Sequence, residues 1–349
     1  MIFIGTDPKA LELFLDRIDK DGIKLNHHIW ECACVDAETE IFTKNGWKAI
    51  SEYDNEEILI SDINSNCFFE KPLKYIKTFC NKWYYYKSLY LKMCLSEGHK
   101  VLYKNNHNIM KTRKIEDIAE KHTKSVGGFK GKIPIGFNYS GNLKLNEWEL
   151  RLAIAVQADG CIRSSKKYID FKVKKQRKKE RIEFLLEKAK INYEKKESNG
   201  YYCYTFYSPL GLKEFPNEWY NLCLENKQQI IDEIFLWDGH VSKDKSQYYS
   251  TNSKRNADFI QFVISSSGYS SNIIIDNRMP TKNINYKISL LNKTYTSLHN
   301  DKKSKRNFII ENETKSAYCF TVSTGFFLCR KNNFIFITGN CGEGNLSEV

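Results

Sequence analysis

Two segments of the sequence repeat one pattern, and this repeat constrains the fold more than any other feature. Residues 145–158 have the apolar spacing of a helix, and this segment ends in the motif LAIAVQADG at Gly160. A second helical segment ends in the similar motif IDEIFLWDG at Gly239. A basic region of strand character and then another helix follow each motif, with the second helices at residues 181–190 and 256–265. The sequence therefore predicts an internal duplication of a helix–strands–helix unit within residues 132–300.

The segments on either side of this unit have strand patterns. Residues 39–43 alternate between apolar and polar side chains, Asn45-Gly46 is a strong hairpin signal, and residues 47–50 form the return strand. Residues 318–341 alternate in the same way about a turn at Asn332-Asn333. We therefore predict a multidomain α+β chain, in which an all-β domain formed by residues 34–131 and 301–340 is interrupted by residues 132–300.

The two ends of the chain complement each other. Residues 1–33 read as a helix and a strand that stops without a following loop, and residues 341–349 read as a glycine loop that opens a helix. Joined, they resemble the cofactor loop of S-adenosylmethionine-dependent methyltransferases of the Rossmann-like class. In that resemblance Gly342 and Gly344 let the backbone approach the cofactor. We expect residues 1–33 and 341–349 to be two pieces of a methyltransferase host.

Three short motifs stand in order along the β-rich segments. Cys34 opens a Cys-x-x-x-x-Thr segment, SEGH follows at residues 96–99, and FITGNC closes the region at residues 336–341. This ordered set resembles the splicing blocks of inteins, which are carried on the horseshoe-like Hint β-fold. The resemblance implies that Cys34 attacks the carbonyl of Ala33 to form a thioester, that His99 donates a proton to the departing nitrogen, and that Ser96 orients the strained bond.

The closing motif supplies the later steps of the same reaction. The resemblance implies that Cys341 takes over the acyl group, that cyclisation of Asn340 releases residues 34–340, and that Cys319 helps to pass protons between steps. The family commonly has a histidine before the terminal asparagine, where this chain has Gly339. Without that histidine, cyclisation of Asn340 is either slow or uses another proton donor. For Cys319 and Cys329, a purely structural role as buried core thiols stays open as the alternative.

The repeated Asp-Gly helices resemble those of LAGLIDADG homing endonucleases, which are frequent passengers of large inteins. The resemblance implies an α/β pseudo-dimer whose motif helices pack side by side, so that Asp159 and Asp238 meet and hold Mg²⁺. Lys213 matches a lysine that assists cleavage in that family, and Lys282 and Lys287 are both candidates for a second one. The second motif has acidic residues, Asp232 and Glu233, in place of small ones, and we expect them to face outward because a buried unpaired charge is costly.

Composition points to a polyanionic partner. The chain has a formal net charge of +12, and its two ends are acidic, so the basic excess lies between them. Residues 168–174 alternate between an apolar face and a face with two lysines, which suits a strand that follows DNA phosphates, although any solvated strand has this pattern. The sequence has no uninterrupted apolar stretch of about 18 residues, no secretory signal and an odd number of cysteines, eleven, so we expect a reducing, cytoplasmic location.

These features predict an intein that catalyses its own excision and carries a Mg²⁺-dependent homing endonuclease. The double-stranded DNA target would be the intein-free host gene across the Ala33–Cys341 junction. The main alternative is a splicing element whose LAGLIDADG domain has decayed to a DNA-binding remnant. A methyltransferase with a large regulatory insertion is disfavoured, because the chain has no methyltransferase catalytic motif.

Overall fold

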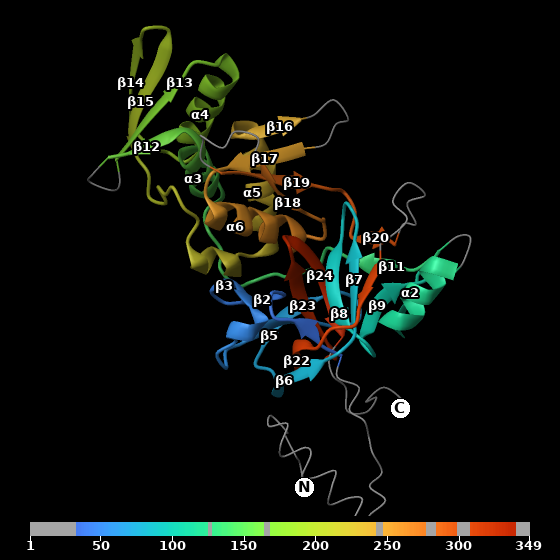
Figure 1. The fold of residues 1–349 in the computed structure, drawn as a ribbon. Helices are drawn as coiled ribbons and strands as arrows, with labels where there is room; N and C mark the ends of the chain where they lie inside the picture. The colour runs from blue at the N-terminus through green and yellow to red at the C-terminus, as the bar shows by residue number, and fades with distance from the viewer. Residues whose placement is uncertain are drawn as a thin grey trace, which may run out of the picture.

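The computed structural model describes residues 33–124, 128–163, 168–241, 247–276, 284–298 and 308–339. These residues form mostly β-structure, arranged as five sheets with five α-helices (Figure 1). The cysteines among them are all free thiols. None of the described helices is long and apolar enough to cross a membrane.

Strands from the two ends of the described chain combine in two six-stranded sheets. The strands are β1 (Val35–Asp36), β2 (Glu40–Thr43), β3 (Gly46–Ala49), β4 (Ile58–Ser61), β5 (Cys67–Glu70), β6 (Lys74–Cys80), β7 (Trp83–Lys87), β8 (Lys92–Ser96), β21 (Phe308–Glu311), β22 (Lys315–Thr321), β23 (Phe326–Lys331) and β24 (Phe334–Gly339). One sheet has the order β21-β7-β8-β1-β22-β6; the other has the order β24-β23-β2-β4-β5, with β3 paired to β2. We call the domain formed by these strands the flanking β domain. Because β1 lies between β8 and β22, neither its N-terminal strands nor its C-terminal strands complete the first sheet alone.

The flanking domain is not all-β, and that prediction was wrong. Helix α2 (Ile115–Lys124) follows β9 (Lys100–Lys104) and β10 (Met110–Lys114), and it buries residues at helical spacing: Ile115, Ile118, Ala119 and His122. The sequence carried this i, i+3, i+4, i+7 signal inside a stretch that otherwise alternates. A third sheet, β10-β9-β11-β20, joins these strands to β11 (Lys132–Pro134) and β20 (Tyr295–Ser297), the two strands at the borders of the predicted insertion.

The region between β11 and β20 contains two units with the same element order. The first consists of α3 (Glu147–Asp159), β12 (Gly160–Ile162), β13 (Tyr168–Val173), α4 (Gln176–Lys188), β14 (Tyr193–Ser198) and β15 (Tyr201–Tyr207). The second consists of α5 (Leu224–Trp237), β16 (Gly239–Val241), β17 (Gln247–Thr251), α6 (Lys254–Ser265), β18 (Ile273–Asp276) and β19 (Asn285–Leu290). Their sheets have corresponding orders, β12-β13-β15-β14 and β16-β17-β19-β18, as an internal duplication requires. A twofold relation between the units stays a prediction.

Both Asp-Gly motifs mark a sharp exit from a helix into a strand. An added Cβ at Gly160 would lie 2.8 Å from the carbonyl oxygen of Val156, and one at Gly239 would lie 2.2 Å from that of Phe235. Real Cβ atoms do not approach backbone this closely, so the chain can turn directly into β12 and β16 only where the side chain is absent. Asp159 and Asp238 are thereby fixed at corresponding ends of α3 and α5.

Glu233 does not face outward, in contrast to the sequence prediction. It lies fully buried on α5, where its carboxylate accepts hydrogen bonds from Arg181 Nε at 3.0 Å, from Arg151 at 3.3 Å and from the Trp237 indole at 2.9 Å. The physical reason is compensation, because arginines on α3 and α4 converge on the carboxylate and offset the cost of burying it. Asp232 is half exposed, as expected.

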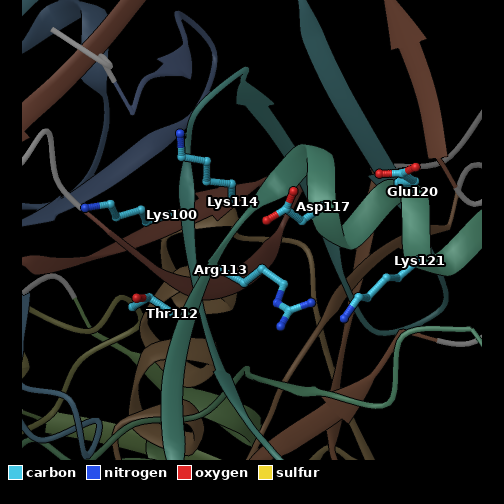
Figure 2. Close-up of a pocket in the computed structure, with 7 residues that line it drawn as sticks. All are labelled: Lys100, Thr112, Arg113, Lys114, Asp117, Glu120 and Lys121. Atoms are coloured by element: carbon cyan, nitrogen blue, oxygen red, sulfur yellow. The ribbon is translucent and has the colours of Figure 1, made fainter.

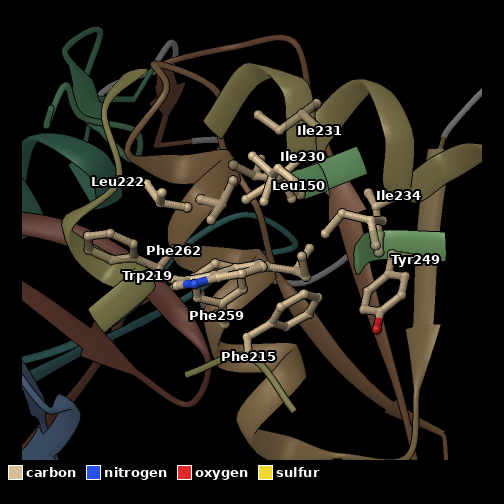
Figure 3. Close-up of a cluster of buried hydrophobic side chains, with 14 of the residues drawn as sticks. Leu150, Phe215, Trp219, Leu222, Ile230, Ile231, Ile234, Tyr249, Phe259 and Phe262 are labelled. Atoms are coloured by element: carbon tan, nitrogen blue, oxygen red, sulfur yellow. The ribbon is translucent and has the colours of Figure 1, made fainter. Parts of the chain in front are cut away.

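One core joins the flanking β domain to the second unit. Figure 3 shows part of this core, where buried side chains of α5 and α6 pack around the aromatic rings of Phe215 and Trp219. Phe262 of α6 stacks on Phe42 of β2, with ring centroids 4.1 Å apart. Arg330 of β23 is 1% exposed and pairs with Glu40 at 2.6 Å and with Asp258 of α6. Stacked rings and a buried ion-pair network therefore connect the flanking β domain to the second unit.

Candidate functional site

The first candidate site lies where the start of β1, the end of β8 and the end of β24 meet; we call Cys34, Ser96, His99 and Thr338 the Cys34 centre. The backbone N–H of Cys34 donates to Ser96 Oγ at 2.9 Å, and the backbone N–H of Ser96 donates to the Cys34 carbonyl at 3.0 Å. Cys34, Ser96 and His99 are all fully buried. Ser96 and His99 lie 62 and 65 positions after Cys34 in the sequence, and together they contact both polar groups of the Cys34 backbone.

His99 contacts both ends of the flanking domain. Its Nδ1 lies 3.2 Å from the Cys34 carbonyl oxygen, and its Nε2 is hydrogen-bonded to the Thr338 hydroxyl. Burial lowers the pKa of His99 to about 4, with the hydrogen bond to Cys34 opposing this effect, so the ring is neutral at neutral pH. Since a carbonyl oxygen can only accept, the single ring proton lies on Nδ1, and Nε2 accepts from the Thr338 hydroxyl.

This geometry differs in detail from the sequence expectation. His99 was expected at the departing nitrogen, whereas Ser96 Oγ holds that nitrogen and His99 contacts the carbonyl of the same residue. The catalytic roles of Cys34, Ser96 and His99 stay predictions. Sequence reasoning missed Thr338, although it stands two residues before Asn340 in FITGNC, because a threonine in a strand is ordinarily a packing residue.

The C-terminal junction shows why a histidine is absent before Asn340. Gly339 ends β24, and an added Cβ there would lie 2.6 Å from the backbone carbonyl oxygen of Lys100, the residue after His99. A side chain at this position would require the backbone of β9 to move. Asn340, Cys341, Gly342 and Gly344 lie outside the described residues. The chain nevertheless brings Cys34 and Thr338 to the two ring nitrogens of one imidazole.

The two other candidate thiols are buried in neighbouring strands. Cys319 of β22 is fully buried, and its Sγ donates to the carbonyl of Phe320 at 3.4 Å. Burial raises the pKa of the Cys329 thiol well above its ordinary value, which suits a core thiol. The proton-passing role of Cys319 stays a prediction.

A basic pocket adjoins the Cys34 centre. It has a volume of about 540 Å³, and Figure 2 shows its lining by β9, β10 and α2: Lys100, Thr112, Arg113, Lys114, Asp117, Glu120 and Lys121. Lys100 belongs both to this lining and to the backbone that packs on Gly339. Four cationic side chains against two carboxylates give the pocket a positive field, which suits an anion.

The second candidate site lies at the ends of α3 and α5; we call Asp159, Asp238, Lys178 and Lys213 the Asp159 centre. Burial raises the pKa of Asp238, and the charge of Asp159 raises it further, so the two carboxylates are close enough to repel each other. The Lys178 ammonium forms an ion pair with Asp159. The structure therefore brings together the two acids that the repeat predicted.

Lys213 also lies at this centre. Its ammonium donates to the carbonyl oxygens of Val156 at 3.1 Å and Gln157 at 3.0 Å, in the last turn of α3. Burial lowers the pKa of Lys213, while the charges of Asp159 and Asp238 oppose that effect. Lys178 was missed because it is one of many cations in the run from Lys172 to Arg181, and sequence alone does not choose among them.

The two candidates for a second lysine do not join this centre in the described residues. Lys287 of β19 pairs with Asp276 of β18 at 2.8 Å, and Lys282 lies outside the described residues. No group of three or more His, Cys, Asp or Glu side chains that could hold a metal is found in the described part of the chain. The pair of repelling carboxylates at Asp159 and Asp238 nevertheless offers the hard oxygen ligands that suit Mg²⁺.

The strands of the first unit carry a basic aromatic face. Ile169, Phe171 and Val173 are buried while Lys172 is exposed, which confirms the predicted alternation along β13. Lys172 lies 4.5 Å from the ring centre of Tyr201 on β15, and Lys174 lies 5.8 Å from the centre of the same ring. Cations held beside aromatic rings suit contact with phosphates and bases.

Comparisons with known proteins give one curated relative. No family model matches the chain. The ribonucleoside-diphosphate reductase subunit beta of Aquifex aeolicus (strain VF5) is 25% identical over 363 residues, covering 88% of this chain and 50% of the relative. The chain thus spans about half the length of the curated relative that it matches. Residues 1–33 and 341–349 are too short to account for a match of this length, so the match includes most of residues 34–340.

Solved structures show only distant likeness. The homing endonuclease I-DmoI in complex with DNA and Mn has a TM-score of 0.31 and 11% identity, covering 41% of this chain and 89% of that chain. The AceL NrdHF class 3 split intein, in a splice-inactive variant, has a TM-score of 0.33 and 10% identity, covering 88% of this chain and 97% of that chain. These TM-scores are too low to carry an argument about this chain.

The methyltransferase interpretation of residues 1–33 and 341–349 was wrong. The curated relative is a ribonucleotide reductase subunit, and none of these similar proteins is a methyltransferase. The error has a simple cause, because a Gly-x-Gly loop after a strand is a short pattern that occurs by chance in unrelated chains. Gly342 and Gly344 consequently have no cofactor assigned to them.

Proposed function

We propose that this chain excises residues 34–340 by autocatalytic protein splicing and joins Ala33 to Cys341. The observation that supports the proposal is that the two ring nitrogens of His99 contact Cys34 and Thr338, and Thr338 stands two residues before Asn340 in the sequence. An excision that ligates the flanks requires the two ends of the excised segment to lie close together, and a contact between Cys34, His99 and Thr338 is consistent with that requirement.

The residues of the Cys34 centre then have definite tasks. Cys34 attacks the Ala33 carbonyl, and Ser96 holds the amide nitrogen that departs. His99, whose Nδ1 contacts the carbonyl of the same residue, would turn to that nitrogen to supply its proton. Transfer of the acyl group to Cys341 and cyclisation of Asn340 complete the reaction. Burial of the centre excludes water, which would otherwise hydrolyse the thioester before ligation.

We propose further that the two repeated units form a LAGLIDADG pseudo-dimer that binds double-stranded DNA through its basic strands. Asp159 and Asp238 would hold a divalent cation, which supplies an activated water and offsets phosphate charge. The alternative, a binding remnant without cleavage, is favoured by one observation: the Lys178 ammonium already neutralises Asp159. The curated relative makes a ribonucleotide reductase β subunit the candidate host in place of a methyltransferase.

The decisive test of splicing is intact-mass measurement of the expressed full chain over time. The expected products are an excised segment of residues 34–340 and a ligated product that reads ECACGEG across the junction. A chain that stays at its full mass under reducing conditions, with no thioester detectable by added thiol, contradicts the proposal. For the endonuclease, purified protein with Mg²⁺ is incubated with a plasmid that carries the intein-free host junction. Salt-sensitive binding without cleavage identifies the remnant.

A further inference from the structure

We propose that Thr338 is a positioning residue that lets His99 change its protonation state, so that one imidazole serves both splice junctions. The proposal rests on the proposed splicing function. It starts from the contact between the Thr338 hydroxyl and His99 Nε2, inside a site where Thr338 is 1% exposed and His99 is fully buried. Because Nε2 of His99 is buried, it cannot form a hydrogen bond to bulk water. The Thr338 hydroxyl therefore determines which protonation states of the ring are stable.

A hydroxyl is suited to this position because it both donates and accepts. In the resting ring the proton lies on Nδ1, toward the Cys34 carbonyl, and Nε2 accepts from the Thr338 hydroxyl. In the imidazolium both nitrogens carry protons, and the same hydroxyl turns to accept from Nε2. A backbone carbonyl or N–H at this place would satisfy only one of these two states.

The first splicing step needs such a change. The Cys34 thiol gives its proton to the ring, which becomes the imidazolium, and the resulting thiolate bonds to the Ala33 carbonyl carbon. The carbon–nitrogen bond to Cys34 then breaks, and the nitrogen takes the Nδ1 proton of that imidazolium. The ring is then neutral with its proton on Nε2, and Thr338 accepts that proton's hydrogen bond. The hydroxyl thus has a matching role in all three states of the ring.

The same contact reaches the second junction. Thr338 stands two residues before Asn340, and Gly339 between them has no room for the histidine that the family commonly uses. His99 is therefore the imidazole that the described structure places next to this strand end. Through Thr338, the orientation of the ring depends on the position of β24, and this links the two junctions.

The test uses full-length chain with Asn340→Ala, which isolates thioester formation, measured by thiol-induced cleavage from pH 6 to 9. Thr338→Val keeps the shape but loses the hydroxyl, and we expect a rate lower by about tenfold, because a hydrogen bond to a charged partner contributes more than one to a neutral partner. The basic limb of the pH profile, where the imidazolium is lost, should move to lower pH for the same reason. Thr338→Ser should restore both the rate and the profile.

A matched control separates positioning from mere loss of packing. Thr43 is also 1% exposed, and its hydroxyl donates to the Gly46 carbonyl at 3.1 Å, away from His99. Thr43→Val should leave the pH profile unchanged. In the chain with Asn340 intact, Thr338→Val should also slow release at the C-terminal junction.

Two results would overturn the inference: a Thr338→Val chain with the wild-type rate and profile, or a Thr338→Ser chain as slow as Thr338→Val. If Thr338→Val does not fold, nitrogen NMR of His99 in the Thr338→Ser chain decides, since serine must preserve the wild-type ring titration. Failure of the proposed function is a different outcome, because the chain with native Thr338 would then form no thioester.

Discussion

The two candidate centres differ in how their polar groups are balanced inside the protein. In the Cys34 centre, Cys34 and Ser96 are fully buried and joined by two hydrogen bonds, and the buried ring of His99 is neutral. In the Asp159 centre two carboxylates repel each other and two ammonium groups oppose them. The polar groups of the Cys34 centre thus satisfy one another, whereas the Asp159 centre is a partly buried cluster of charges that suits an ionic ligand.

The strongest test of this comparison separates the two centres by mutation. Cys34→Ala should abolish thioester formation and splicing, because alanine has no nucleophile, and it should leave DNA affinity unchanged. Asp159→Asn should leave the splicing yield unchanged, and in an active endonuclease it should lower cleavage at least a hundredfold while sparing binding. Intact mass and plasmid cleavage measure the two activities in the same preparations. Loss of splicing in Asp159→Asn would show that the centres are not independent.

Much of this division could be predicted from sequence. The order of the Cys34, SEGH and FITGNC motifs and the repeated Asp-Gly helices were visible in the sequence, and the structure brings their described members together. The partners Thr338 and Lys178 could not be predicted, because each is a common residue type whose role depends on a contact made across the fold. Glu233 was misplaced for the same reason, since its compensating arginines come from two other helices.

The second prediction concerns that buried charge. Glu233→Ala should lower the free energy of unfolding by about 3–5 kcal/mol, because Arg151 and Arg181 lose their shared buried partner. Asp232→Ala is the matched control; its side chain is 50% exposed, so the expected change is about 0.5 kcal/mol or less. Urea unfolding of splice-blocked chains measures both. Equal effects of the two substitutions would contradict the buried network.

The third prediction uses the neutral character of His99. Burial lowers its pKa from the ordinary 6.5 to about 4, so between these values the unfolded chain binds more protons than the folded chain. The stabilisation is therefore complete above about pH 6.5 and is lost as pH falls toward 4. At about 1.4 kcal/mol per pKa unit, the loss is about 3 kcal/mol.

Carboxylates titrate over the same pH range as His99, so a His99→Gln chain serves as the reference that contains the carboxylates and lacks the imidazole. Both chains carry Cys34→Ala and Asn340→Ala so that a single species is present. Urea unfolding at pH 7.5 and pH 4.5 should show a loss that is larger by about 3 kcal/mol when the imidazole is present. The same loss in both chains would mean that His99 is not buried as a neutral ring.

The smallest expected effect tests whether the Asp159 centre can accept a cation. Lys178 holds Asp159 in an ion pair, and its charge lowers the pKa of Asp238, so a divalent cation must compete with this ammonium for both acids. Lys178→Met should therefore tighten Ca²⁺ binding by about tenfold, the scale of one partly solvated charge interaction. Lys287→Met is the control, because Lys287 pairs with Asp276 in the second unit, and it should change nothing. Calorimetric titration compares the two chains. Tighter binding in Lys178→Met alone would establish a cation site that the native chain restrains. Unchanged or weaker binding would show that the Lys178 ammonium does not keep a cation from this site.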